Sequence, residues 1–138
     1  EEAAPLFRRA LEARERTLGA EHPRTLISVN QMALLLQAQG QLEEAAPLFR
    51  RALEARERTL GAEHPNTLNT RGNLGRLCMH KPSAEDQAAG RATVAEVLRK
   101  LRVPPLSLPE THPWVKKFAG ALAEARAEEG AKKEKEDE

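Results

Sequence analysis

The sequence is poor in aromatic residues and in cysteine, and both shortages limit what the chain can be. Its 138 residues contain no tyrosine, and phenylalanine and tryptophan together make up only 3%, so alanine and leucine must fill most of any core. The single cysteine, Cys78, rules out an internal disulfide. No apolar run approaches the roughly 18–20 residues of a membrane-spanning helix, and no secretory signal is recognisable. We therefore expect no membrane insertion and no disulfide scaffold.

The charge is almost balanced, with 22 Lys and Arg against 21 Asp and Glu. This interleaved pattern lacks the basic surface that a nucleic-acid or membrane-surface partner requires. One unpaired thiol is compatible with a reducing compartment, so we expect an intracellular protein, cytoplasmic by default, with a chloroplast or cilium as the alternative. The first lysine is Lys81, which places an organisational boundary near 81–83. The chain begins at Glu1 inside a repeat, as expected for a piece of a longer protein.

The clearest feature of the sequence is an internal copy. Residues 1–23, "EEAAPLFRRALEARERTLGAEHP", recur unchanged at 43–65, at a distance of 42 residues. An active site requires a few residues in space and does not require a copied string. A fixed period of roughly 20–50 residues is typical of stacked repeat architectures. The period therefore predicts a solenoid.

One repeat unit contains two amphipathic helices, which we call helix A (24–39) and helix B (42–60). Apolar residues recur in both at the three- and four-residue steps of a helix, and Gly40 and Gly61 suit their ends. Because the joining segment is short, the pair forms an antiparallel hairpin that buries its apolar stripe by stacking on the next hairpin. We predict an all-α chain, an α-solenoid of antiparallel hairpins followed by an extended segment and a last helix. The expected helices are 2–18, 24–39, 42–60, 66–80, 84–102 and 113–130.

The packing positions resemble the tetratricopeptide repeat. Small Ala33, then Leu36, Ala45, Phe49 and Ala52, have the spacing of that motif. The unit has 42 residues, whereas the common form has about 34. The longer helix B and its "LG-x-x-HP" turn are similar to the repeats of kinesin light chains and nephrocystin-type proteins. The resemblance covers residues 1–80, which we treat as the repeat array.

In this family helix A lines a concave groove, and the resemblance therefore implies a peptide-binding site on the two A helices. Asn and Gln side chains can pair with the backbone of an extended peptide, and Arg76 can meet its carboxylate. The predicted peptide-binding residues are Asn30, Leu34, Gln37, Asn69, Arg76, Met79 and His80.

Beyond residue 80 the pattern decays into four predicted segments. Residues 81–102 form a diverged helix B that caps the array, and 103–112 form an extended, proline-rich linker. A C-terminal helix follows at 113–130, and a charged tail, solvated or disordered, at 131–138. Apolar residues recur along the linker and at the start of the last helix, and we predict that three of them contact a partner: Leu106, Leu108 and Trp114.

No catalytic or metal-binding constellation is recognisable. His22, His64 and His112 occupy copies of one turn, where helix entry explains them. Cys78 and His80 are two residues apart on a helix, so they point away from each other. There is no phosphate loop, GxSxG or HExxH motif. We predict no catalytic residues, no metal and no cofactor, and hence no enzyme.

The sequence thus predicts a non-catalytic scaffold that binds a partner protein or peptide, as part of a larger complex or a longer chain. One alternative is an accessory subunit of a large assembly, for example photosynthetic or ciliary. A nucleic-acid-binding helical repeat is a weaker alternative, because the charge is balanced and base-reading repeats use other periods. An incomplete array also predicts that the chain alone is marginally stable.

Overall fold

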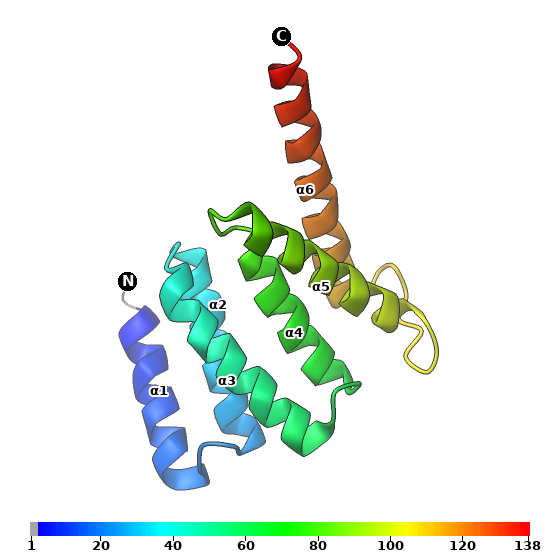
Figure 1. Ribbon diagram of the computed structural model, residues 1–138. Coiled ribbons are helices and arrows are strands. Elements are labelled where there is room, and N and C mark those ends of the chain that lie inside the picture. Colours follow the sequence, from blue (N-terminus) through cyan, green and yellow to red (C-terminus); the bar gives the residue numbers. More distant parts are fainter. Residues whose placement is uncertain (1–2) are drawn as a thin grey trace.

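The computed structural model describes residues 3–138, with side chains from residue 5 onward, and this part of the chain is entirely helices and loops. The predicted start of the first helix at residue 2 lies outside the described residues. Consecutive helices from α1 to α4 lie side by side and alternate in direction, as predicted for stacked hairpins (Figure 1). The six helices are α1 (Ala3–Leu18), α2 (Pro23–Ala38), α3 (Leu42–Leu60), α4 (Pro65–Cys78), α5 (Ala84–Arg102) and α6 (Pro113–Glu136).

The repeated "HP" pair starts three of these helices in the same way. In each copy the histidine is the N-cap, and its Nδ1 accepts a hydrogen bond from the backbone N–H two residues further on, at 3.1 Å. The following proline occupies the first turn, where its missing N–H leaves no helical bond unmade. The role in helix entry predicted for His22, His64 and His112 is therefore confirmed.

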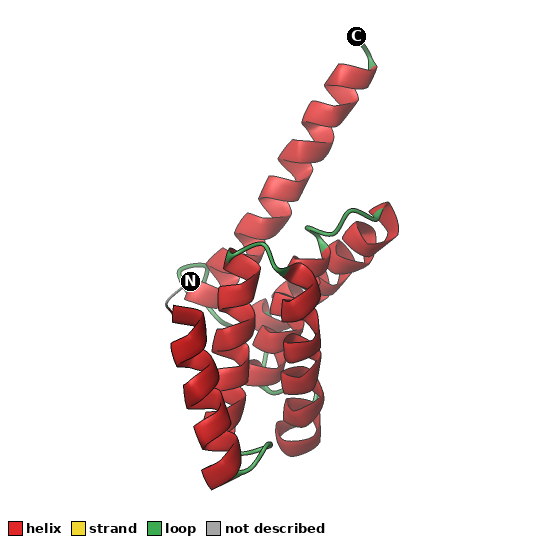
Figure 2. Ribbon diagram, turned by 90° about the vertical axis from the view of Figure 1, so that its left-hand side faces the viewer, coloured by secondary structure: helices red, strands yellow, loops and turns green. Residues whose placement is uncertain are grey.

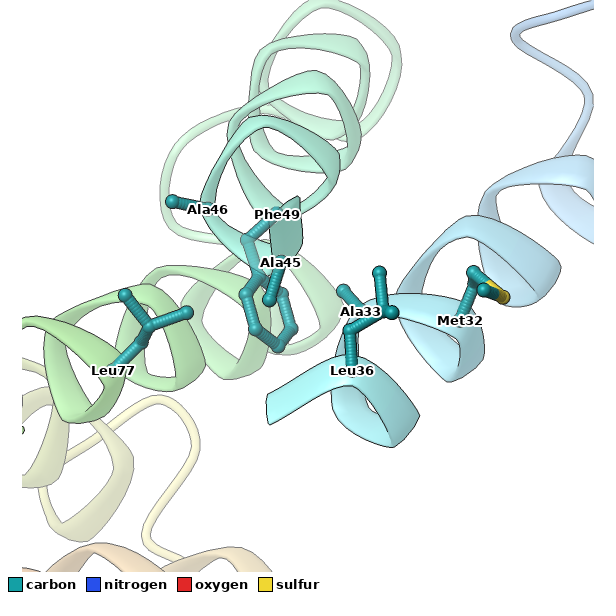
Figure 3. Packing of buried hydrophobic residues seen from close by; sticks show 7 residues of the cluster. All are labelled: Met32, Ala33, Leu36, Ala45, Ala46, Phe49 and Leu77. Carbon is teal, nitrogen blue, oxygen red and sulfur yellow. The ribbon is translucent and has the colours of Figure 1, made fainter. Parts of the chain in front are cut away.

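The first core cluster lies where α2, α3 and α4 meet (Figure 3). Phe49 of α3 points between α2, which contributes Ala33 and Leu36, and Leu77 of α4, and it is fully buried. Small Ala33 and Ala45 let α2 and α3 approach closely around the ring. Phe7 is the copy of Phe49 in α1, but it is only half-buried, because it packs against this cluster from one side.

The second core cluster joins α4, α5 and α6. Leu68, Val97, Leu101 and Phe118 are buried at its centre. The Phe118 ring lies so close to Gly72 that a Cβ there would come within 2.4 Å of it. The glycine that weakens α4 as a helix therefore admits the aromatic side chain of α6.

Two boundaries differ from the prediction by two or more residues. The last helix continues to Glu136, so the expected charged tail is helical up to that residue. Alanine, lysine and glutamate all favour helix, and Lys133 and Lys135 lie in the last turn, where positive charge complements the helix dipole. Conversely, α4 ends at Cys78 and not at residue 80. The C-terminal half of α6 projects away from the other helices (Figure 1, Figure 2).

Candidate functional site: a groove between α2 and α4

A shallow groove of about 400 Å³ lies between the C-terminal turns of α2 and α4 and includes the start of α3. Apolar side chains and small residues share its wall with one guanidinium, one amide and one imidazole. Such a lining can hold an apolar side chain and also offers hydrogen-bond donors at its edge. The lining residues are Leu34, Gln37, Ala38, Gly40, Leu42, Arg76 and His80.

Four of the seven residues predicted for peptide binding come together in this groove: Leu34, Gln37, Arg76 and His80. A fifth, Asn30, lies one turn before Leu34 on α2 and is half-buried. Its Oδ1 is enclosed and accepts no hydrogen bond from the described residues. That these residues bind a peptide stays a prediction.

The remaining two predicted groove residues have contacts elsewhere. Asn69 is buried, and its Oδ1 accepts a hydrogen bond from Lys117 Nζ of α6 at 2.9 Å. Met79 packs against the second core cluster. The structure thus places α6 over α4 at Asn69, where the sequence alone predicted an open groove.

Arg76 of the groove lies near a second positive charge, the ammonium of Lys117 on α6. The pKa of Lys117 is lowered to about 8, chiefly by desolvation and also by the Arg76 guanidinium. The Lys117 ammonium also lies 4.6 Å from the centre of the Phe118 ring, within the range of a cation–π contact. The Arg76 side of the groove therefore favours a negatively charged group.

The three residues predicted for partner contact have neighbours within the chain. Leu106, Leu108 and Trp114 are half-buried against the second core cluster. The linker is folded back on α5, because the Leu108 N–H donates to the Leu101 carbonyl oxygen at 2.8 Å. Whether these side chains also touch a partner stays a prediction.

Sequence reasoning missed a polar contact that joins each helix B to the following helix A and is found in two copies, the second of them buried. Arg56 of α3 is buried, and its Nη1 donates to Thr70 Oγ1 of α4 at 2.6 Å. In the preceding copy Arg14 Nη1 donates in the same way to Ser28 Oγ at 2.6 Å. Each member of the pair has its counterpart 42 residues further on, so the period could have indicated this contact.

A surface ion pair also follows the period and extends it into α5. Glu21 pairs with Arg58, and 42 residues on, Glu63 pairs with Lys100 at 2.7 Å. Lysine replaces arginine, but the geometry is kept. This relationship supports the interpretation of α5 as a diverged helix B.

Among residues 3–138, no group of three or more His, Cys, Asp or Glu is placed to hold a metal ion. None of the helices in residues 3–138 combines the length and apolarity needed to cross a membrane. Cys78 is half-buried beside Gly90.

Stacked helical hairpins with a groove across their A helices define an α-solenoid. The family model for the tetratricopeptide repeat matches residues 1–57 and 26–95. The chain therefore belongs to the tetratricopeptide repeat family, whose members are typically non-catalytic and generally mediate protein–protein interactions. No curated protein matches the chain.

Among solved structures, the chain is similar to a Podosopora anserina protein described as a kinesin light chain with nearly identical TPR-like repeats. The TM-score is 0.74 at 28% identity, and the match covers 94% of this chain. A variant of that protein with one substitution matches equally well. The chain spans 58% of the length of these neighbours. The repeats are therefore of the kinesin-light-chain type.

Proposed function

We propose that the chain is a non-catalytic interaction module that holds an extended peptide segment of a partner protein in the groove between α2 and α4. The observation that carries the proposal is the meeting of Leu34, Gln37, Arg76 and His80 along one groove. An extended peptide offers backbone N–H and C=O groups that amide side chains can pair with, and alternate side chains that enter pockets.

The positive charge of the groove narrows the class of peptide that we propose it binds. Arg76 lines the groove, and Lys117 lies near enough to Arg76 for the two positive charges to interact. A guanidinium binds a carboxylate through two parallel hydrogen bonds. Leu34 and Leu42 provide the apolar part of the wall. The proposed ligand is therefore a segment with an apolar residue beside an acidic one.

The test is selection from a displayed library of random 12-residue peptides, followed by fluorescence anisotropy on the selected sequences. Arg76→Glu should weaken binding at least about tenfold, because one favourable charge pair becomes a repulsive one. Raising the salt concentration should weaken binding to the parent. Arg50→Glu is the matched control, since Arg50 is exposed on α3 and does not line the groove.

Two results contradict this proposal. One is selection of peptides whose affinity is the same for the parent, Arg76→Glu and Leu34→Asp. The other is selection of basic peptides, because the groove would then bind the opposite charge. Circular dichroism should show that each variant retains the helix content of the parent. A loss of binding then cannot be attributed to unfolding.

A second candidate function is that of an accessory subunit in a larger assembly, and the projecting part of α6 favours it. Residues 126–138 of this helix and its end are exposed throughout (Figure 2). Glu129 pairs with Arg91 of α5 at 2.9 Å, and the turns that follow it are available to a neighbour. Leu106, Leu108 and Trp114 would extend that contact. Deleting residues 127–138 should abolish assembly but leave peptide binding in the groove unchanged, which separates the two functions.

A further inference from the structure

A second cleft, of about 470 Å³, lies between the α3–α4 turn and the loop that follows α5 (Figure 1). Its wall is mostly apolar, because it is lined by Leu68 of α4 and by Val103, Pro104, Pro105 and Leu106 of the loop. None of these residues lines the groove between α2 and α4. The cleft is therefore a separate feature of the molecule.

The cleft lies where the chain departs from its own period. Three residues separate Leu60 from His64 in the repeat, whereas nine separate Arg102 from His112. The additional residues form the loop, and its first four residues, 103–106, make up the apolar wall on that side. The cleft thus depends on a segment that the repeat itself does not contain.

The loop is held in a defined position. The Leu108 N–H donates to the Leu101 carbonyl oxygen of α5 at 2.8 Å, and the Ser107 N–H donates to the Val103 carbonyl oxygen at 2.9 Å. Leu106 packs against the second core cluster. A wall that is already ordered does not have to be ordered on binding, which favours affinity.

A reversal of charge lies at the same cleft. The repeat has Glu57 at a position where α5, 42 residues later, has Arg99. The neighbouring Lys100 is shared by two carboxylates, Glu63 at 2.7 Å and Glu96 at 3.3 Å. Arg99 lines the cleft, is exposed, and forms no salt bridge with the side chains of residues 5–138. Its guanidinium is therefore free to bind a carboxylate through two parallel hydrogen bonds.

We infer that this cleft binds an acidic segment of a partner protein, with one aliphatic side chain of the segment in the cleft and a neighbouring carboxylate on Arg99. A small molecule is typically buried by about 70–90% in its site, whereas here Val103 is 40% exposed and both prolines are exposed. A partner protein can cover such an open rim with the surface around the inserted side chain. The inference rests on the proposal that the chain is an interaction module, but it does not depend on the groove.

The experiment is an NMR titration of the full chain with labelled leucine and valine methyl groups. The probes are three acetylated and amidated tripeptides, Glu-Leu-Glu, Gln-Leu-Gln and Lys-Leu-Lys, which share the aliphatic side chain and differ in charge. The methyl resonances of Val103 and Leu106 report on the cleft, and those of Leu34 and Leu42 report on the groove. One titration therefore separates the two sites.

The Glu-Leu-Glu peptide should shift the Val103 and Leu106 resonances saturably. It should bind there at least about fivefold more tightly than Gln-Leu-Gln, because charge-assisted hydrogen bonds are stronger than neutral ones. Lys-Leu-Lys should bind most weakly. Arg99→Gln should make the Glu and Gln peptides equal, and Arg99→Glu, which restores the residue of the repeat, should reverse the order of the three. Arg50→Glu is the matched control, since Arg50 is exposed and lines neither site.

Equal affinities of the three peptides at Val103 and Leu106 would overturn the inference. Shifts confined to Leu34 and Leu42 would also overturn it, although that result would still support the groove. If octanoate saturates the Val103 resonance at a lower concentration than Glu-Leu-Glu, the cleft is a small-molecule site and the assignment to a partner protein is wrong. If the Val103 resonance moves with the concentration of the chain alone, a second copy occupies the cleft, which equally overturns the assignment. Circular dichroism of each variant checks that the helix content is unchanged.

Discussion

Gly90 of α5 lies directly against the backbone of Gly75 on α4. A Cβ at Gly90 would lie 2.4 Å from the Gly75 carbonyl oxygen and 2.8 Å from the Met79 amide nitrogen. The two helices thus meet at their backbones, which only residues without a side chain permit. Glycine inside a helix costs roughly 1 kcal/mol relative to alanine, and here the close approach of α4 and α5 offsets that cost.

Gly90→Ala should therefore destabilise the chain, although alanine is the better helix former. The added methyl group meets backbone atoms that cannot rotate away, and overpacking of this kind costs about 1–3 kcal/mol. The matched control is Gly120→Ala in α6, because a Cβ there meets nothing within 4 Å. That change should stabilise by up to about 1 kcal/mol. Urea unfolding of both variants measures the change in the free energy of unfolding, which should fall for Gly90→Ala and rise for Gly120→Ala. A stabilising Gly90→Ala would contradict the backbone contact.

Two chemically identical substitutions should differ in cost because the two copies differ in burial. Phe49→Ala removes a fully buried ring and should cost on the order of 3–5 kcal/mol. Phe7→Ala removes a half-buried ring, and its cost should be clearly smaller. Equal losses in urea melts would mean that α1 is covered in solution as fully as α3.

The helical period predicts most of the fold, whereas contacts that do not follow the period could not be predicted from the sequence. The hairpins could be predicted because the repeat fixes the positions of Ala33, Phe49 and Gly61. From helix propensity alone Gly72 and Gly75 only weaken α4, because the sequence does not show that Phe118 and Gly90 pack against them. The groove was predicted from α2 and α4 alone, and the approach of α6 to Asn69 depends on the irregular loop before it.

The buried contact between Arg56 and Thr70 should contribute measurably to stability. Arg56 also donates to the Asn66 carbonyl oxygen at 3.2 Å, and burial lowers the pKa of its guanidinium. Thr70→Val leaves a buried charge with one acceptor fewer and should cost about 1–3 kcal/mol. In a double-mutant cycle with Arg56→Met, the two changes should couple by about 0.5–3 kcal/mol.

Arg58→Met is the control for that cycle. Arg58 lies two residues further along α3, and its side chain is 60% exposed in its ion pair with Glu21. Exposed pairs contribute about 0–1 kcal/mol. Additive losses for Arg56→Met and Thr70→Val would mean that the two side chains do not act together.

Lys117 should make stability depend on pH in the alkaline range. Its folded-state pKa is about 8, below the ordinary 10.5, chiefly because burial disfavours the ammonium. Above pH 8 the folded chain releases this proton while the unfolded chain still holds it, so the free energy of unfolding rises with pH. The burial penalty is fully present below pH 8 and is relieved as the pH approaches 10.5.

The measurement compares the parent with Lys117→Met in urea between pH 7.5 and 10. The stability of the parent relative to the variant should improve by on the order of 1–2 kcal/mol over this range, a figure reduced because part of the side chain remains in solvent. Lys116→Met is the matched control, since Lys116 is exposed and adjacent, and its difference from the parent should stay flat. A difference for Lys117→Met that is equally flat would show that the ammonium is not desolvated between α4 and α6.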